Sequence, residues 1–260
     1  MNEIQALLLG ILQGLTEFLP VSSSGHLEIG HALLDVKTGN NLLFALVVHV
    51  ATVLSTLVVF RKDLMALLSG LTAFKWNEST RYVFMLLFSA VPVLIPGLFF
   101  EEQIEQFFTG NLLLVGSMLL VTSALLTFAH YAKKGTLKIT FASSFIIGIA
   151  QALAVMPGIS RSGATIATGL LLKTKKEEVA RFSFLMVIIP ILGAALLDLT
   201  GSNSLTETSI EPIPLVIGFL GAFISGLLAC SWMIKIVKQG NLIYFAIYCF
   251  TIGIIAIFAA

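Results

Sequence analysis

Long apolar stretches alternate with short polar segments along most of the chain. Six of these stretches approach or exceed the length of about 20 residues that a helix needs to cross a membrane. They are residues 41–60, 82–100, 112–131, 179–199, 214–235 and 242–260. The pattern of hydrophobic and polar positions therefore predicts six transmembrane helices.

Two further apolar regions are interrupted by small and polar residues. Residues 3–19 are followed by PVSSSGH and then by the short segment 27–36. Residues 140–155 are followed by MPGISRSGAT and then by the short segment 166–172. Neither short segment can span a bilayer alone, and non-helical backbone is tolerated at that depth only where protein or water satisfies it. Each region is predicted to be a re-entrant hairpin or one long broken span.

The distribution of basic residues separates these two alternatives. Thirteen of the fifteen lysines and arginines lie in four connections, which the positive-inside rule assigns to the cytoplasm. These connections are residues 61–81, 133–138, 173–181 and 235–238. Residues 133–138 and 173–181 must then lie on one side, so the region between them has to return to the side where it entered. The first interrupted region has acidic flanks and is predicted to enter from outside.

The two interrupted regions are related to each other by a constant offset of 138 residues. Within positions 10–25, seven residues are identical to those at the offset positions, namely Gly10, Ile11, Gln13, Leu15, Ser22, Ser24 and Gly25. Each half then has one hairpin and three spans, and an odd number of spans gives the halves opposite orientations. In such inverted repeats the broken elements form a site near the midplane.

The predicted fold is an all-α polytopic membrane protein with six transmembrane helices and two re-entrant helical hairpins. Residues 1–260 form a single membrane domain, in which residues 1–131 are the first inverted repeat and residues 139–260 the second. The hairpins of the two repeats are residues 3–36 and 140–172.

The composition agrees with a membrane environment. Hydrophobic residues make up 57% of the chain and charged residues 11%, whereas soluble domains carry about 25% charged residues. The mean hydropathy is +1.00. The net charge of +1 and the absence of a block of basic residues argue against a nucleic-acid partner. Membrane lipids are the expected surroundings.

Polar and ionisable side chains gather at the two hairpin tips. The first tip offers Gln13, Glu17, Ser22, Ser23, Ser24 and His26, and the second offers Ser160, Arg161, Ser162 and Thr165. We expect Gly25 and Gly163 to allow close backbone approach and positive φ, and to leave N–H groups free at the start of each short helix. Two helix N-termini and an arginine form a site for an anion. The tips therefore indicate phosphate binding or phosphoryl chemistry within a membrane.

The charged residues of the tips can be given roles on chemical grounds. Arg161 is expected to bind phosphate, because a planar guanidinium binds two oxygens at once and a charge within the membrane is usually functional. His26 is a candidate nucleophile or general acid and base. Glu17 is expected to orient His26 or to hold a divalent cation on the phosphate oxygens.

Structural roles compete with these chemical ones. Ser22 and Ser24 can serve as N-caps of the short helix that follows them. Gln13 is repeated as Gln151, which indicates a shared role in packing or hydrogen bonding. The residues that do not recur in the second hairpin are the stronger candidates for chemistry.

The segments QGLTEFLPVSSSGH, residues 13–26, and PGISRSGAT, residues 157–165, resemble the two signature segments of a known family. It is the bacterial undecaprenyl pyrophosphate phosphatase family, whose members are also called bacitracin-resistance proteins. The resemblance covers essentially the whole chain. The family's first motif has Glu or Gln, three residues and Glu, and it falls on Gln13 and Glu17. A glutamine at position 13 gives it a supporting role and weakens the case for two carboxylate ligands of a metal.

The resemblance also implies the reaction. Such enzymes hydrolyse the terminal phosphate of C55 polyprenyl diphosphate and release the monophosphate carrier lipid of cell-wall synthesis, which confers bacitracin resistance. They depend on Mg²⁺ or Ca²⁺ and lie in the bacterial inner membrane with the site open to the extracytoplasmic face. A homodimer is left open.

The family's serine, histidine and phosphate-binding arginine fall on Ser23, His26 and Arg161. By the resemblance, Arg161 and the tip N–H groups hold the pyrophosphate, and either His26 or Ser23 attacks phosphorus or His26 activates a water. Glu17 orients His26 or binds the metal ion. The phosphate-binding surroundings are predicted to be Ser160, Ser162, Thr165, Ser22, Gly25 and Gly163.

Two other classes of protein are compatible with parts of the pattern. A polyprenyl-phosphate flippase or secondary transporter would use the same anion site without cleavage, and inverted repeats are typical of transporters. A type-2 phosphatidic acid phosphatase shares a motif similar to SSSGH. That group needs a second histidine after its arginine, and no histidine follows Arg161 in this chain, so it is excluded.

Overall fold

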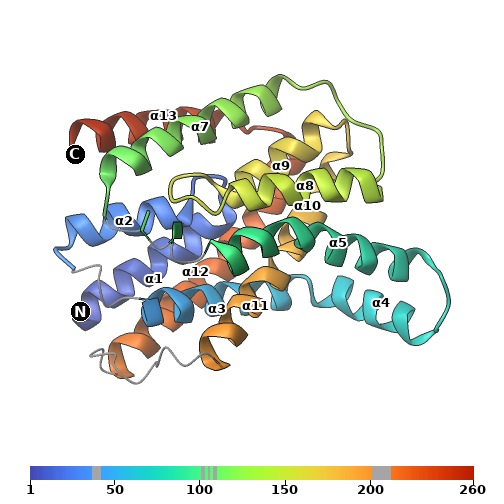
Figure 1. Cartoon of the computed structure of the whole chain (residues 1–260), viewed down its shortest axis with the longest axis horizontal. Helices are drawn as coiled ribbons and strands as arrows, with labels where there is room; N and C mark the ends of the chain where they lie inside the picture. The colour runs from blue at the N-terminus through green and yellow to red at the C-terminus, as the bar shows by residue number, and fades with distance from the viewer. Residues whose placement is uncertain (37–41, 101–102, 105, 108–109, 201–211) are drawn as a thin grey trace.

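The computed structural model describes residues 1–36, 42–100, 103–104, 106–107, 110–200 and 212–260. Over these residues the fold consists of helices and connecting segments, with one isolated β-bridge between Leu137 and Thr174. The helices are α1 (Glu3–Phe18), α2 (Ser23–Leu33), α3 (Leu42–Val59), α4 (Arg61–Thr72), α5 (Glu78–Phe99), α7 (Leu112–Tyr131), α8 (Phe141–Leu153), α9 (Arg161–Leu171), α10 (Lys176–Met186), α11 (Ile188–Thr200), α12 (Pro212–Gln239) and α13 (Ile243–Phe258). Many of them run roughly along the longest axis of the molecule (Figure 1).

Three helices in the described part of the chain, α5, α7 and α12, are long and apolar enough to cross a membrane. Helices α3 and α4 would supply a fourth span if they act together, although they are bent by 75° relative to each other. The predicted stretch 242–260 forms the shorter helix α13. Residue 41, the first of the predicted stretch 41–60, lies outside the described residues. Large apolar side chains such as Phe84, Leu94 and Leu228 are exposed on the long helices, as a lipid-facing surface requires.

The sequence predicts one continuous helix over residues 179–199, and this prediction is wrong. The structure has two helices there, α10 and α11, which are separated at Val187. The cause is Pro190, which has no N–H to donate to the carbonyl of Met186 and whose ring would clash with that carbonyl in a continuous helix. Proline is instead tolerated within the first turn of a helix, which is where it lies in α11.

Both interrupted regions have the form of a medium helix, a non-helical tip and a short helix. The first consists of α1 and α2, and the second of α8 and α9. Helix α1 packs on α12, and α8 packs on α5 (Figure 1). Gly10 of α1 touches the backbone of Gly218, and Gly148 of α8 touches the backbone of Ser89 in the same manner. Each glycine permits a close helix approach that a larger side chain would prevent.

Helices α7 and α13 also make a close contact, and it is reciprocal. A Cβ atom at Gly116 would lie 2.6 Å from the carbonyl oxygen of Gly253, and one at Gly253 would lie 2.9 Å from that of Gly116. Two glycines that each face the other's carbonyl are the arrangement expected for elements related by a local two-fold axis.

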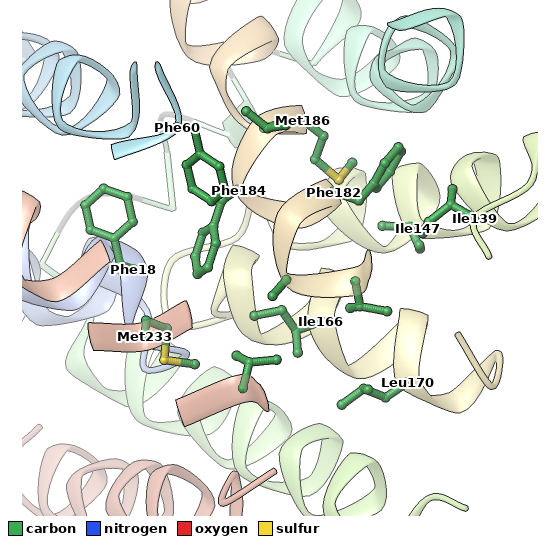
Figure 2. Close-up of a cluster of buried hydrophobic side chains, with 14 of the residues drawn as sticks. Phe18, Phe60, Ile139, Ile147, Ile166, Leu170, Phe182, Phe184, Met186 and Met233 are labelled. Carbon is green, nitrogen blue, oxygen red and sulfur yellow. The ribbon is translucent and has the colours of Figure 1, made fainter. Parts of the chain in front are cut away.

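The main hydrophobic core surrounds α10, which is buried on nearly all sides. Figure 2 shows Phe18 and Phe60 close to Phe184, with ring centroids 6.0 and 6.1 Å from that of Phe184. On the other side of the same helix, Phe182 and Met186 are fully buried. Helix α10 is charged in its first turn, but from Val179 to Met186 its residues other than Arg181 are buried, so this part forms a wall beside the hairpin tips.

Candidate active site

The short helices of both hairpins begin with a serine cap. Ser22 Oγ accepts a hydrogen bond from the N–H of Gly25 at 3.3 Å, and Ser160 Oγ accepts one from Gly163 at 3.0 Å. The capping role considered for Ser22 is therefore confirmed. The caps use the N–H groups of Gly25 and Gly163, so these two are not among the free N–H groups expected at the start of each short helix.

Positive φ occurs in both tips, but not at the glycines where it was expected. Gly25 and Gly163 lie inside helices, whereas Ser22 has φ 71° and Gly158 has φ 96°. A helix needs the ordinary right-handed φ, so the turn is made by the residues before it. The expected close approach does occur, because a Cβ atom at Gly25 would lie 3.0 Å from the Cα atom of Gly158.

Hydrogen bonds hold the two tips against each other and against α7. Ser162 Oγ donates to the carbonyl of Leu19 at 3.2 Å, which joins the second tip to the first. Thr122 Oγ1 of α7 donates to the carbonyl of Gly158 at 2.9 Å and accepts from the N–H of Ser160 at 2.9 Å. The tips therefore form one joined unit.

Glu17, at the end of α1, connects groups from both tips. Its Oε1 accepts a hydrogen bond from Arg161 Nη2 at 2.7 Å, and this contact is also an ion pair. Its Oε2 accepts from Ser23 Oγ at 2.6 Å and from Gln13 Nε2 at 2.9 Å. The Glu17 side chain is 6% exposed and that of Arg161 is 26% exposed, so the arginine remains partly open to a ligand.

His49 of α3 joins this group, as expected for a histidine within a span that contacts a neighbouring helix. Its Nε2 lies 3.7 Å from Glu17 Oε2. Its Nδ1 lies 2.7 Å from the carbonyl of Ala45, and because a carbonyl only accepts, Nδ1 is the donor. The one signal for His49 in the sequence is a histidine inside an apolar stretch.

His26 is held away from Glu17 by other partners. Its Nδ1 donates to the carbonyl of Ser22 at 2.8 Å, and its Nε2 lies 2.8 Å from the hydroxyl of Tyr248 in α13. The rings of His26 and Tyr248 are stacked with centroids 5.5 Å apart. The expected orientation of His26 by Glu17 is therefore wrong for this structure. Tyr248 lies in a uniformly apolar stretch, and no local pattern singles it out.

The remaining predicted phosphate-binding residues serve the framework of the tips in this structure. Thr165 Oγ1 donates to the carbonyls of Arg161 and Ser162 at 3.0 and 3.2 Å, and the residue is 1% exposed. Ser160 Oγ, which caps α9, also lies 3.3 Å from Ser162 Oγ. Ser22 Oγ and Ser24 Oγ are likewise 3.3 Å apart. Direct contact of these hydroxyl groups with phosphate stays a prediction.

A cavity lies beside the pair of Glu17 and Arg161. Helices α1, α3, α9, α10 and α11 contribute to it. Its lining residues are Glu17, Phe18, Thr52, Val53, Thr56, Arg161, Ser162, Ser183, Phe184, Val187 and Ile191. The polar pair thus borders a space whose other walls are largely apolar.

The site has a limited set of groups for a metal ion. Among the described residues, no cluster of three or more His, Cys, Asp and Glu side chains has metal-binding geometry. Glu17 supplies one carboxylate, and the buried Oε1 of Gln13 beside it has no hydrogen-bond partner. Mg²⁺ is often bound by one or two protein oxygens together with substrate phosphates, so this pair of oxygens fits such an ion.

The arrangement is suited to phosphoryl transfer. A serine hydroxyl that donates to a buried carboxylate is a nucleophile with its proton acceptor in place. A guanidinium on the other oxygen of the same carboxylate offers further N–H groups to phosphate oxygens. The nucleophile and the anion-binding group therefore come from different hairpins and meet at one side chain.

Comparisons with known proteins agree with this chemistry. The family described as Bacitracin resistance protein BacA matches residues 6–255. The chain is 53% identical over 262 residues to an undecaprenyl-diphosphatase of Bacteroides fragilis, covering 99% of this chain and 98% of the relative. It is 54% identical to one of Parabacteroides distasonis over 260 residues, with 99% and 98% covered. A relative of the same name from Carboxydothermus hydrogenoformans is 37% identical over 259 residues, with 98% and 96% covered. The chain belongs to the bacitracin resistance protein BacA family.

Proposed function

We propose that this membrane protein is an undecaprenyl-diphosphatase. It hydrolyses the terminal phosphate of undecaprenyl diphosphate and releases undecaprenyl monophosphate and inorganic phosphate. The observation that carries the assignment is the convergence of Ser23 and Arg161 on the two oxygens of Glu17. The names of the relatives give the same activity, and they do not favour the alternative of a flippase.

Ser23 is the proposed nucleophile. Its hydroxyl already donates to Glu17 at 2.6 Å, so the carboxylate can take the proton as Oγ attacks the terminal phosphorus. The bond between that phosphorus and the bridging oxygen breaks, and the electron pair leaves with undecaprenyl monophosphate. His26 is less suited to attack, because both of its ring nitrogens are engaged by Ser22 and Tyr248.

Arg161 is the proposed phosphate-binding group. One of its N–H groups is bonded to Glu17, and the side chain is 26% exposed, so the rest of its planar fork can meet phosphate oxygens. Charge that develops on the transferred group would be stabilised by this fixed cation. Ser160, Ser162 and Thr165 support the turn that carries it.

A divalent cation, Mg²⁺ or Ca²⁺, fits beside the same carboxylate. Glu17 and the unpartnered Oε1 of Gln13 would hold it together with oxygens of the diphosphate. When bound, such an ion neutralises charge on the phosphate groups.

The proposed arrangement in the membrane is an inverted repeat of residues 1–131 and 139–260. Each half contributes one re-entrant hairpin and three spans, in a bacterial inner membrane with the site open to the extracytoplasmic face. Support comes from the matched contacts of Gly10 and Gly148 and from the reciprocal contact of Gly116 and Gly253. The distribution of basic residues supports the stated orientation.

The direct test is phosphate release from undecaprenyl diphosphate by the purified protein in detergent with added Mg²⁺. We expect release by the unaltered protein and its loss in Ser23→Ala and Arg161→Ala. Tight binding of undecaprenyl monophosphate without any phosphate release would instead support the flippase alternative. For orientation, a cysteine at Asp35 should react with an impermeant thiol reagent in intact cells, while one at Lys134 should be shielded. The native cysteines, Cys230 and Cys249, are buried and give little background.

A further inference from the structure

The cavity beside Glu17 and Arg161 contains a hydroxyl group without a partner. Ser183 of α10 lines this cavity, is 4% exposed, and its Oγ makes no hydrogen bond. Leaving a buried polar group without a hydrogen bond is unfavourable. Proteins usually avoid that cost by placing a bound water at such a position.

The other polar groups of the cavity lining are mainly acceptors. Thr52 Oγ1 donates its one hydrogen to the carbonyl of His49 at 2.8 Å, and Thr56 Oγ1 donates to that of Thr52 at 3.1 Å. Each hydroxyl then has only lone pairs left to offer. The carboxylate of Glu17 is an acceptor as well. Arg161 adds N–H donors at one side of the lining. A water molecule can donate two hydrogens to the acceptor oxygens and accept from Ser183.

The size of the cavity also indicates a water molecule as its ligand. Its remaining walls are mostly apolar and close around the polar groups, namely Phe18, Val53, Phe184, Val187 and Ile191. The space available to water in this partly open cavity suits about one water molecule. Because Glu17 and Arg161 also border it, a water here lies next to the reacting groups.

We propose that this cavity binds the water molecule that the hydrolysis consumes, with the Ser183 hydroxyl as its anchor. The inference rests on the proposed function, in which Ser23 becomes phosphorylated. The water oxygen bonds to phosphorus, the bond from phosphorus to Ser23 Oγ breaks, and its electron pair stays on Oγ. Glu17 first passes the Ser23 proton to the departing undecaprenyl monophosphate and is a free carboxylate again. It then takes one water proton and returns it to Oγ, while the other water proton leaves with inorganic phosphate. Ser183 positions the water and does not touch the lipid.

The test compares Ser183→Val, which fills the cavity and removes the hydroxyl, with Ser183→Thr, which keeps it. Ser144→Val is the matched control, because Ser144 is a fully buried serine of α8 outside the cavity. Steady-state phosphate release from undecaprenyl diphosphate is measured, and acid-quenched samples are assayed by mass spectrometry for phosphate on Ser23. In Ser183→Val we expect release to fall at least about tenfold while phosphorylated Ser23 accumulates, since misplacing a reactant by 1 Å can cost a hundredfold.

Ser144→Val should release phosphate within about twofold of the unaltered protein, as changes away from the reacting groups do. Ser183→Thr, which keeps the hydroxyl, should accumulate less phosphorylated Ser23 than Ser183→Val. Ser183→Ala, which adds no volume, is the second variant if Ser183→Val does not fold, and it should also accumulate phosphorylated Ser23. Unchanged release by both Ser183→Val and Ser183→Ala would overturn the inference. An equal fall in Ser23 phosphorylation and in phosphate release in these variants would also overturn it. A high-resolution crystal structure without a water molecule in the cavity would do the same. Absence of phosphate release by the unaltered protein would contradict the proposed function itself.

Discussion

The two hairpin tips share a framework and differ in the residue that follows each cap. Ser22 and Ser160 cap their helices through the same hydrogen bond. The first helical residue is Ser23 in one tip and Arg161 in the other, at positions related by the 138-residue offset. Both residues contact Glu17, one at each carboxylate oxygen. Equivalent backbone positions thus bring the proposed nucleophile and the proposed anion-binding group to the same side chain.

The tips also differ in where the backbone is strained. Ser22 has φ 71°, a region that residues other than glycine rarely adopt, whereas its counterpart Ser160 has φ −72°. The second tip places positive φ on Gly158, where it costs little. Strain of this kind tends to occur where function requires a particular geometry, and it lies directly before Ser23.

The glutamines at equivalent positions, Gln13 and Gln151, also differ between the two hairpins in their hydrogen bonds. Gln13 donates to Glu17, whereas the amide nitrogen and oxygen of the buried Gln151 have no hydrogen-bond partner. The residue equivalent to Glu17 in the second half is Val155. The second hairpin therefore keeps the glutamine without the carboxylate that accepts a hydrogen bond from it in the first.

The largest effect on activity is expected when the two residues that distinguish the tips are exchanged. The double variant Ser23→Arg, Arg161→Ser keeps the composition of the site but reverses the partners of Glu17. We expect phosphate release to fall at least about a thousandfold, because both nucleophile and anion-binding group are misplaced. Ser23→Ala and Arg161→Ala should lose a similar amount each. Recovery of activity in the exchanged variant would contradict the assigned roles.

Glu17→Gln removes the charge on which both tips converge. Phosphate release should fall by about 10²–10⁴-fold, the usual contribution of a positioned proton acceptor. The matched control is Glu78→Gln on α5, because that side chain is 94% exposed and forms a surface ion pair with Lys138. Steady-state assays of both variants measure the effect, and equal activities would remove Glu17 from the mechanism.

Gly10→Ala and Gly148→Ala test whether the halves pack in the same way. Each new methyl group would meet the backbone of the neighbouring helix, so each should destabilise the fold by about 1–3 kcal/mol. Gly97→Ala in α5 is the control, since a Cβ atom there has nothing within 4 Å. Thermal unfolding in detergent gives the comparison. A large loss in only one half would show that the two contacts are not equivalent.

The smallest expected effect concerns the caps. Ser160→Gly should cost a few tenths of a kcal/mol through the lost cap. Ser22→Gly loses the same cap but relieves a strain of about 1–3 kcal/mol, so it should be neutral or stabilising. The measurement is again thermal unfolding in detergent, with opposite signs expected for the two tips. Equal destabilisation would mean that the positive φ of Ser22 carries no strain.

The hairpins and their caps were predictable because they depend on local chemistry. Serine caps, glycines at close approaches and the break before α9 are all visible in the order of residues. The approach of the two tips was expected from the proposed inverted repeat, whose broken elements meet near the midplane, but the ion pair of Glu17 with Arg161 was not predicted.

Contacts set by the packing of distant helices could not be predicted in the same way. Tyr248 approaches His26 from near the end of the chain, and His49 reaches Glu17 from α3. The break at Val187 was missed because an apolar run hides the effect of Pro190 on the preceding turn. Positive φ at Ser22 was missed because glycine is the default expectation for that conformation.

The convergence on Glu17 has a consequence for how such a protein can be assembled from parts. Two identical hairpins in a symmetric dimer would carry the same amino acid at the position after the cap, hence two serines or two arginines. The observed site needs one of each, together with a carboxylate from only one side. Joining the halves in one polypeptide allows the two copies to diverge independently while their stoichiometry stays at one to one. In the proposed repeat, covalent linkage thus allows an asymmetric site on a shared scaffold.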